Sequence, residues 1–281
     1  MTAPASRVPA APTSTAANIL TALLEARAGQ TLTSERSWRI ETALKPLLRE
    51  RGLETLDQLV SRLLSDRDPG IGDRIVEALL NGETSFFRDP MVFDTVIELA
   101  AARSDRRPRI WSAGCSTGQE PLSLAMLFAE RAEETRAPVP DIVATDLSDA
   151  ALARAHTGLY SQFEVQRGLP IRRAMRWFEA QPSSEWLASP TLLRMIAYRR
   201  LNLIAESWPL GTFDAILCRN VLLYLAPALK PAVFERFAAS LRPGGILILG
   251  AGETVIGQTR LFVPSRSHRG AYVRVEDEDS A

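Results

Sequence analysis

The sequence predicts a doubly wound, mostly parallel α/β sheet that follows a small all-α domain. Through residues 18–80, apolar residues recur at spacings of three and four, which is the pattern of amphipathic helices. From residue 108 onward, short β-branched runs alternate with helical stretches, as in parallel strands joined by crossover helices. The 281 residues are enough for each part to bury a core of its own.

The helical domain is expected over residues 18–80, with turn signals such as Arg51-Gly52 between its helices. The expected helices are ILTALLEA, WRIETALKPLLRE, LDQLVSRLL and DRIVEALL. Residues 1–17 are rich in Ala, Pro, Ser and Thr, so we expect a disordered tail there. Residues 81–107 are expected to link the helical domain to the sheet, with Pro90 starting a helix.

The sheet domain is expected over residues 108–275. Its predicted strands are RIWSAG, DIVATD, FDAILCRNV and GILILG, and FVPSRSHRGAYVRV predicts a final antiparallel pair. PLSLAMLFAERAEE, SDAALARAH and LKPAVFERFAASL are the helices expected between strands. The alternation breaks at residues 159–200, which predicts an inserted subdomain, and residues 276–281 predict an acidic, disordered tail.

Composition excludes several classes of protein. Lysine plus arginine equals aspartate plus glutamate, at 33 each, so no net charge attracts nucleic acid or an anionic membrane. Cys115 and Cys218 lie in apolar strand patterns, and two histidines add no metal-ligand spacing, so neither a disulfide framework nor a metal site is expected. No run resembles a signal peptide or a membrane span, which predicts a cytoplasmic protein without membrane insertion.

A cofactor site is predicted where the first strand ends. RIWSAG runs into Gly114-Cys115-Ser116-Thr117-Gly118 and then a helix, and glycines such as Gly114 let a ligand approach the backbone closely. The spacing lacks the G-x-G-x-x-G pattern that seats a pyrophosphate on a helix N-terminus. A nucleoside without phosphates fits this loop better.

Two carboxylates stand near that loop, and each has a structural alternative. Asp146 ends the second strand, where a carboxylate accepts both ribose hydroxyls, although it also suits a helix cap for SDAALARAH. The glycine loop upstream favours ribose. Glu120 either completes a capping box with Thr117 or meets a cationic group of the ligand, and the spacing supports both equally. A ribose without phosphates and a cationic group point to S-adenosylmethionine.

With these motifs placed in order, the chain resembles the CheR family of chemotaxis receptor glutamate methyltransferases. The resemblance covers nearly the whole chain from about residue 18, including the helical domain and the insertion YSQFEVQRGLP. The motifs that carry it are NGETSFFRD, SAGCSTGQEP, ATDLS, RRLNL and FDAILCRNVLLYL. It implies a Rossmann-like methyltransferase sheet that binds S-adenosylmethionine and releases S-adenosylhomocysteine.

The resemblance also implies roles for single residues. The S-F-F-R segment closes over the cofactor in the family, and its threonine and arginine touch the cofactor. Glu120 is implied to bind the methionine amino group, and Asp146 is similar to the ribose ligand. The remaining implied positions are Thr84 and Arg88 in the closing segment, Asn202 and Leu203 beside adenine, Arg219 and Asn220 lining the site, and Tyr224 near the reacting methyl.

The adjacent aromatics Phe86 and Phe87 are then expected to anchor the closing segment in the core, with Arg88 reaching the cofactor. The alternative is a surface arginine paired with Asp89, a residue that also suits the cap of the helix begun at Pro90. Arg88 and Tyr224 would orient the reacting groups, and neither would act as a base. Trp111, Cys115 and Cys218 are expected in the core, and His156 packs beside the insertion.

The chain departs from the family at two places. Gly82 stands where the family commonly has asparagine, with Asn81 displaced by one position. The second helix, which is usually strongly basic and faces the receptor, holds Arg39, Lys45, Arg49 and Arg51, but Ala43, Pro46 and Leu47 occupy positions where arginine is frequent. Lys45 and Arg49 suit either an acidic receptor surface or an ion-pair row with Glu41.

The implied partner is the helical cytoplasmic bundle of a chemoreceptor, methylated by a monomeric enzyme. Two other functions remain open. One is a methyltransferase of the same fold with another substrate, which the weakened basic helix supports. The other is an adaptor that binds S-adenosylmethionine without turnover, which Arg88 and Tyr224 disfavour. The balanced charge and the lack of a Pro-Pro-Tyr or Pro-Cys motif both argue against a nucleic-acid methyltransferase.

Overall fold

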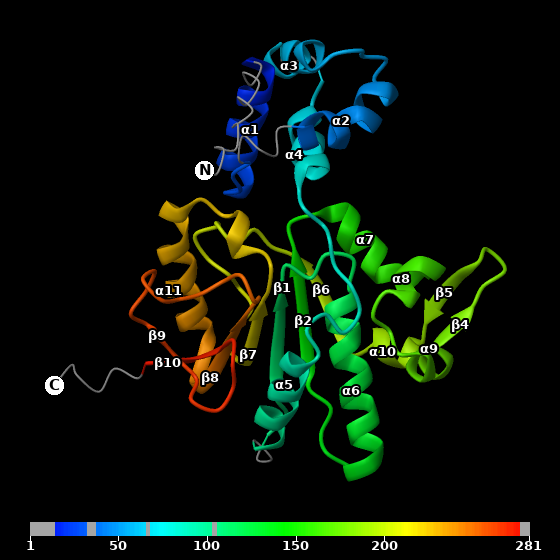
Figure 1. Ribbon diagram of the computed structural model, residues 1–281, viewed down its shortest axis with the longest axis vertical. Helices are drawn as coiled ribbons and strands as arrows, with labels where there is room; N and C mark the ends of the chain where they lie inside the picture. The colour runs from blue at the N-terminus through cyan, green and yellow to red at the C-terminus, as the bar shows by residue number, and fades with distance from the viewer. Residues whose placement is uncertain (1–14, 33–37, 66–67, 103–105, 276–281) are drawn as a thin grey trace, which may run out of the picture. The chain divides into compact units, whose positions relative to one another are not determined.

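The computed structural model describes residues 15–32, 38–65, 68–102 and 106–275, in two compact units, residues 1–81 and 82–281 (Figure 1). Most of the predicted N-terminal tail and all of the acidic C-terminal tail lie outside the described residues. Helix α1 begins at Thr15, so residues 15–17 are helical and the predicted tail boundary was wrong. Ala16 and Ala17 are buried, which holds this first turn against the unit.

The first unit is helical, as predicted. Its helices are α1 (Thr15–Ala28), α2 (Trp38–Glu50), α3 (Leu56–Leu64) and α4 (Ile71–Leu79). Each helix buries one apolar stripe, because its apolar residues recur at helical spacing. Leu20 in α1, Leu44 in α2 and Ile75 in α4 are fully buried. Helix α3 begins with a capping box, in which Thr55 and Gln58 satisfy each other's backbone amides.

The second unit is built on a seven-stranded sheet of order β6-β2-β1-β7-β8-β10-β9. The first five of these strands are parallel, and β10 and β9 form the predicted antiparallel pair at the other edge. The strands are β1 (Arg109–Ala113), β2 (Asp141–Asp146), β6 (Ile196–Arg200), β7 (Phe213–Cys218), β8 (Leu241–Leu249), β9 (Phe262–Pro264) and β10 (Ala271–Arg274). This is the doubly wound fold that the alternation of patterns predicts.

Helices cover both faces of the sheet (Figure 1), and alternate strand residues point to opposite faces. Ile110 and Ile142 pack into the cluster formed with α5 and α6, whereas Trp111 and Val143 pack into the cluster formed with α11. Both faces are therefore apolar, as a parallel sheet requires. The helices are α5 (Met91–Ala101), α6 (Gln119–Thr135), α7 (Asp149–Thr157) and α11 (Lys230–Ser240), with short 3₁₀ turns η2 (Leu222–Tyr224) and η3 (Pro227–Leu229).

The insertion is a small subdomain with its own three-stranded antiparallel sheet, of order β3-β5-β4. The predicted boundary of 159–200 was wrong at its end, because Ile196–Arg200 forms β6 and pairs with β2 in the main sheet. The elements of the insertion are β3 (Leu159–Ser161), α8 (Gln162–Gln166), α9 (Ile171–Trp177), β4 (Phe178–Ala180), β5 (Glu185–Ala188) and α10 (Pro190–Leu193). Strand β6 escaped prediction because it is an edge strand with polar, solvent-facing residues.

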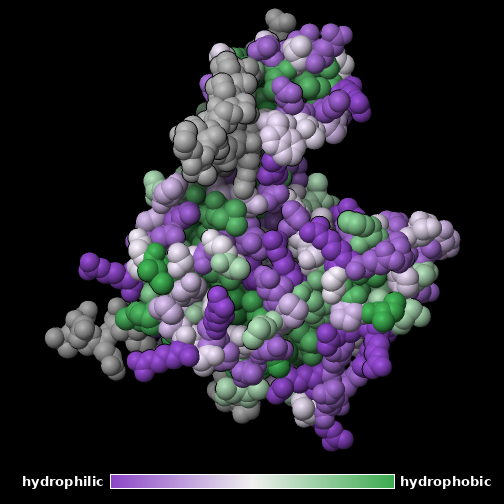
Figure 2. All heavy atoms as spheres, viewed as in Figure 1, coloured by the Kyte–Doolittle hydropathy of each residue, from purple (hydrophilic) through white to green (hydrophobic). Residues whose placement is uncertain are grey.

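The face of the molecule that Figure 2 shows is largely polar. In the view of Figure 2, hydrophobic residues occur as patches among hydrophilic ones. Among the residues that the structure describes, no helix combines the length and the apolar character that crossing a membrane requires.

Candidate functional site

The site lies at the carboxyl ends of the parallel strands, where the sheet order changes direction. From β1, the chain order runs to β2 and β6 on one side and to β7 and β8 on the other. In a doubly wound sheet, ligands bind at this point, outside the carboxyl ends of the strands. Apart from Thr84 and Arg88, the predicted cofactor residues lie at or after the ends of β1, β2, β6 and β7, so the fold brings these segments to one edge.

The glycine loop after β1 is held by the neighbouring strand. The amides of Gly114 and Cys115 both donate to the Thr145 carbonyl, at 2.8 and 2.9 Å. Gly114 has a φ of +78°, and a Cβ there would lie 2.4 Å from the Val221 side chain. Only glycine lets the loops after β1 and β7 approach this closely.

Asp146 binds the glycine loop and does not cap the next helix. Its two oxygens accept the backbone amides of Ser116, at 2.8 Å, and Ser148, at 2.9 Å. Ser148 itself caps α7, because its hydroxyl accepts the Ala151 amide at 2.9 Å. The capping alternative for Asp146 is therefore wrong.

Glu120 likewise does not form the capping box that its spacing allows. Gly118 is the N-cap of α6, without a side-chain cap, and the Glu120 carboxylate turns toward the strand ends. It accepts the Ser112 hydroxyl at 2.7 Å and the Arg219 guanidinium at 2.9 Å. The Glu120 side chain is 13% exposed, so this carboxylate is held at the end of β1 by two fixed donors.

Arg219 connects the strand ends to the segment of residues 82–89, which we term the closing segment. Its side chain is only 2% exposed, and it donates to the Arg88 carbonyl at 2.7 Å and to the Asp89 carboxylate at 2.5 Å, besides Glu120. One buried guanidinium thus joins residues that lie far apart in the chain. Its planar fork of donors is what makes several acceptors possible at once.

This arrangement overturns the alternatives considered for Asp89. Asp89 pairs with Arg219 and not with Arg88. The N-cap of α5 is Pro90, without a side-chain cap bond. The guanidinium of Arg88 makes a long contact of 3.5 Å with the Glu83 carbonyl. Thr84, the residue after Glu83, is half-buried.

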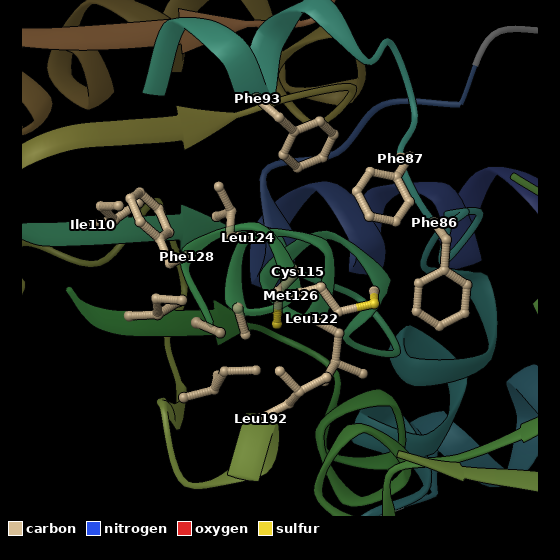
Figure 3. Packing of buried hydrophobic residues seen from close by; sticks show 14 of the residues in the cluster. Phe86, Phe87, Phe93, Ile110, Cys115, Leu122, Leu124, Met126, Phe128 and Leu192 are labelled. Carbon is tan, nitrogen blue, oxygen red and sulfur yellow. The ribbon is translucent and has the colours of Figure 1, made fainter. Parts of the chain in front are cut away.

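The two phenylalanines anchor the closing segment in the core, as predicted. Phe86 is 1% exposed and Phe87 is 8% exposed, and Figure 3 shows them projecting from the same segment. The ring centroid of Phe86 lies 5.1 Å from that of Tyr160 in the insertion, and Phe87 lies 5.6 Å from Phe93 in α5. The Phe87 amide also donates to the buried Ser123 hydroxyl at 3.0 Å.

The start of the closing segment bonds to the glycine loop. The Ser116 hydroxyl donates to the Gly82 carbonyl at 2.6 Å, and a Cβ at Gly82 would lie 3.4 Å from that hydroxyl oxygen. The residue that departs from the family pattern therefore contributes its backbone to the site. The sequence offered no signal for this contact, because it joins two segments through a main-chain oxygen.

Asn202 and Leu203 follow β6 in a turn beside the end of β2. The Leu201 amide donates to the Asp146 carbonyl at 2.9 Å, which ties this turn to the predicted ribose ligand. Asn202 is half-buried and its side-chain oxygen accepts the Ile204 amide at 3.2 Å. Leu203 is 9% exposed and packs with the core behind the strands.

Backbone strain gathers around this site. Of the six non-glycine residues with positive φ in the described part of the chain, Phe87, Asp89, Ser116 and Asn220 have values between 49° and 59° and lie in these loops. Such conformations persist only where surrounding contacts impose them, and they are frequent at functional sites.

Comparison with known proteins identifies the family. Residues 82–271 match the family model described as "CheR methyltransferase, SAM binding domain". The chain belongs to the CheR methyltransferase family. It is 36% identical to chemotaxis protein methyltransferase 1 of Pseudomonas aeruginosa, over 83% of this chain and 87% of that protein. It is 33% identical to chemotaxis protein methyltransferase 1 of Vibrio cholerae, over 90% of this chain and 94% of that protein.

Membership in the CheR family makes this protein an S-adenosylmethionine-dependent methyltransferase, and its site fits that cofactor chemically. Carboxylates stand at the ends of β1 and β2, where a cationic amino group and a ribose diol need acceptors. Among the described residues, the buried Nε of Arg219 and Oδ1 of Asn220 have no hydrogen-bond partner within the protein, so polar atoms at the β7 end remain available to a ligand.

The two buried thiols beside the CheR site are not activated as nucleophiles. Burial raises the pKa values of the Cys115 and Cys218 thiols well above the ordinary range, so both behave as core residues, as predicted. Trp111 is fully buried and donates its indole N–H to the Thr145 hydroxyl. The ring of His156 packs against that of Tyr198, with 4.9 Å between the ring centroids. Within the described ranges, no cluster of potential ligands that could hold a metal ion occurs.

Two further residues of the CheR site, Ser112 and Glu253, were not among those predicted from the sequence. Ser112 stands inside a strand and orients Glu120, and Glu253 follows β8 and binds the loop after β7. Because alternate strand residues lie on the same face, Ser112 is expected on the face of Gly114. This is a weak indication that Ser112 belongs to the site. For Glu253, the only signal in the sequence is its position at the end of the glycine-rich stretch LGAGE, which follows a strand.

Proposed function

We propose that this protein transfers the methyl group of S-adenosylmethionine to glutamate side chains in the cytoplasmic helical bundle of a chemoreceptor, forming methyl esters. The observation that carries the proposal is its similarity to proteins named chemotaxis protein methyltransferases over up to 90% of the chain. That share is larger than residues 82–281 make up alone, so the similarity includes the helical unit.

Different residues of the proposed site would bind the ribose, the adenine and the amino group of the cofactor. Asp146 would accept the ribose hydroxyls, and the turn of Asn202 and Leu203 beside it would hold the adenine. Glu120 would meet the cationic amino group, since its carboxylate is held at the strand end by Ser112 and Arg219. Gly114, Thr84, Arg219 and Asn220 would complete the lining. The positions of Asp146 and Glu120, at neighbouring strand ends, support this division.

The acceptor needs little acid-base help. A glutamate side chain with a pKa near ~4.3 is already an anion at neutral pH. When bound, S-adenosylmethionine supplies a methyl group on a positively charged sulfonium, which is a good leaving group. The protein's task is therefore to position the acceptor and to exclude water, and a site without a cysteine or histidine nucleophile is consistent with it.

Arg88 and Tyr224 are the proposed orienting residues. Arg88 belongs to the closing segment, and its guanidinium makes one long contact within that segment, so it can turn toward an acceptor carboxylate at small cost. Tyr224 ends the 3₁₀ turn η2 after β7 and is half-buried. Its hydroxyl would donate to the acceptor oxygen.

Helix α2 is the proposed docking element for the receptor. Lys45 and Arg49 are exposed on one face of α2, and neither has an ion-pair partner among the residues that the structure describes. The alternative of an ion-pair row with Glu41 is not observed within those residues. Two unpaired cations one turn apart suit a helical bundle rich in glutamates.

A label-transfer assay tests the reaction. The purified protein is incubated with S-adenosylmethionine carrying a labelled methyl group and with the cytoplasmic fragment of a chemoreceptor from the same organism. Label on the receptor that is released by mild base, as expected for glutamate methyl esters, supports the proposal. Cofactor binding without any receptor label would refute it and leave another substrate, or the adaptor function, as the explanation.

Charge reversal tests the docking element. In the variant Lys45→Glu/Arg49→Glu, the receptor KM should rise about tenfold or more, because attraction becomes repulsion at the docking face. The affinity for S-adenosylhomocysteine should stay unchanged. Arg62→Glu is the matched control, since Arg62 is an exposed cation on α3 of the same unit. Equal KM values for the two variants would exclude α2 as the docking helix.

A further inference from the structure

We infer that Glu253 is a positioning residue for methyl transfer, which holds the loop of residues 219–224 in its binding conformation. Glu253 follows β8 and lies outside the sequence motifs that carry the family resemblance. Its carboxylate accepts four backbone amides: Gly250 and Asn220 at 2.8 Å, Val221 at 2.9 Å and Leu223 at 3.1 Å. The inference rests on the proposed cofactor roles of Arg219 and Asn220.

The two carboxylate oxygens have separate tasks. Oε2 accepts the amides of Gly250 and Asn220 and so joins the ends of β8 and β7. Oε1 accepts the amides of Val221 and Leu223, which belong to the turn that leads to Tyr224. A single side chain thus provides the acceptor for backbone amides where β7 and β8 end, in a loop that is partly withdrawn from water.

The conformation that Glu253 holds is a strained one. Asn220 has a φ of +59°, in the left-handed region that non-glycine residues adopt at a cost. Gly250 permits the close approach, because a Cβ there would lie 2.8 Å from Glu253 Oε2 and 2.9 Å from the Asn220 amide nitrogen. Without the carboxylate, Asn220 would be free to relax, and Arg219 before it would lose its alignment with Glu120 and Asp89.

The side chains that depend on this loop are those of Arg219 and Asn220, at the end of β7. Arg219 precedes the strained residue and makes the contacts to Glu120 and to the closing segment. Asn220 has a buried side-chain oxygen without a partner among the described residues. Glu253 itself bonds the backbone behind them, so it acts on the cofactor through the loop and need not touch it.

The test is the variant Glu253→Gln, which keeps the size of the side chain but turns one acceptor oxygen into a donor that faces amide N–H groups. We expect the Kd for S-adenosylhomocysteine, measured by calorimetry, to rise about tenfold. Hydrogen exchange of the amides of residues 220–223 should accelerate. Glu130→Gln is the matched control, because Glu130 is a half-buried carboxylate of the same unit that binds Arg173 and Trp177 in the insertion.

The variant Asn220→Ala separates this inference from the proposed site. If Asn220→Ala weakens binding but Glu253→Gln does not, the loop binds the cofactor and Glu253 is not a positioning residue. If neither variant weakens binding, the role of the loop and the inference both fail. A loss of thermal stability equal to that of Glu130→Gln, with an unchanged Kd, would also overturn the inference, because Glu253 would then serve folding alone.

Discussion

At the level of single residues, Arg88 is the sharpest test of the proposed chemistry. Among the residues that the structure describes, the Arg88 guanidinium has one hydrogen bond, the 3.5 Å contact with the Glu83 carbonyl, so Arg88→Ala should change the free energy of unfolding by less than about 0.5 kcal/mol. Turnover should fall about 100-fold, because the acceptor would lose its orienting charge. Urea denaturation and the label-transfer assay measure the two quantities.

The control for this prediction is Arg194→Ala. Arg194 is an exposed arginine after α10 in the same unit, and its loss should leave both turnover and stability unchanged. Normal turnover in a folded Arg88→Ala protein would remove Arg88 from the site. A large loss of stability would instead indicate that Arg88 supports the closing segment and not the reaction.

The sequence singles out individual candidate residues more readily than their partners. Asp146 and Glu120 stand out as candidates because strand ends and a glycine loop have recognisable patterns. The bond between Arg219 and Asp89 spans 130 positions, and that of Glu253 with Asn220 spans 33, so no local pattern announces either. Such contacts arise only once the sheet order has brought the strand ends together.

At the level of elements, Gly168 links the insertion to the closing segment. It has a φ of +93°, and a Cβ there would lie 2.2 Å from the Phe86 carbonyl oxygen. Gly168→Ala should therefore cost about 1 kcal/mol of backbone strain and, in addition, push Phe86 from its place. Because Phe86 anchors the closing segment, the Kd for S-adenosylhomocysteine should rise several-fold.

Gly257→Ala is the matched control for that clash. Gly257 lies in the same unit with a φ of +74°, and a Cβ there would meet nothing within 4 Å. It should show the strain cost alone, with unchanged binding by calorimetry. If the two variants lose equal stability and bind equally well, the insertion does not support the closing segment.

Helices and strands could be predicted from the sequence where their apolar residues follow one clear spacing. The buried strands β1, β2, β7 and β8 each contain a short apolar run, and the helices of the first unit carry apolar stripes. Strand β6, IAYRR, is polar because it lies at the sheet edge, and the strands β3 and β4 of the insertion have three residues each. Short or edge strands carry too few apolar residues for their period to be recognised.

At the level of the whole molecule, the two ends of the sheet serve different purposes. The carboxyl ends carry the strained, polar candidate site, whereas the opposite end carries an ion cluster around the buried Asp214, near the start of β7. The Asp214 side chain is fully buried and accepts the Arg106 and Arg242 guanidinium groups at 2.6 and 2.8 Å, and the Arg109 amide at 2.9 Å. This cluster closes the end of the sheet that the site does not use.

The charge of Asp214 makes stability depend on pH. Burial by itself raises the pKa of Asp214, but the Arg109 amide, the Arg106 hydrogen bond and the charges of Arg106 and Arg242 outweigh burial and hold the pKa below its ordinary value of 3.8. Because the folded pKa is lowered, the stabilisation is fully present above pH ~4 and is lost as the pH falls through the folded pKa.

Asp214→Asn tests this linkage. At pH 7 it should lower the free energy of unfolding by about 3 kcal/mol, since it replaces a fully buried carboxylate by a neutral amide among donors that require an anion. The difference from the unchanged protein should shrink below pH ~4, where protonation removes the same charge. Urea denaturation from pH 7 to pH 3 measures it. Asp141→Asn, whose exposed carboxylate pairs with Arg107 at 3.1 Å, should cost less than about 1 kcal/mol throughout. A constant difference for Asp214→Asn across this range would show that packing, and not charge, holds this end of the sheet.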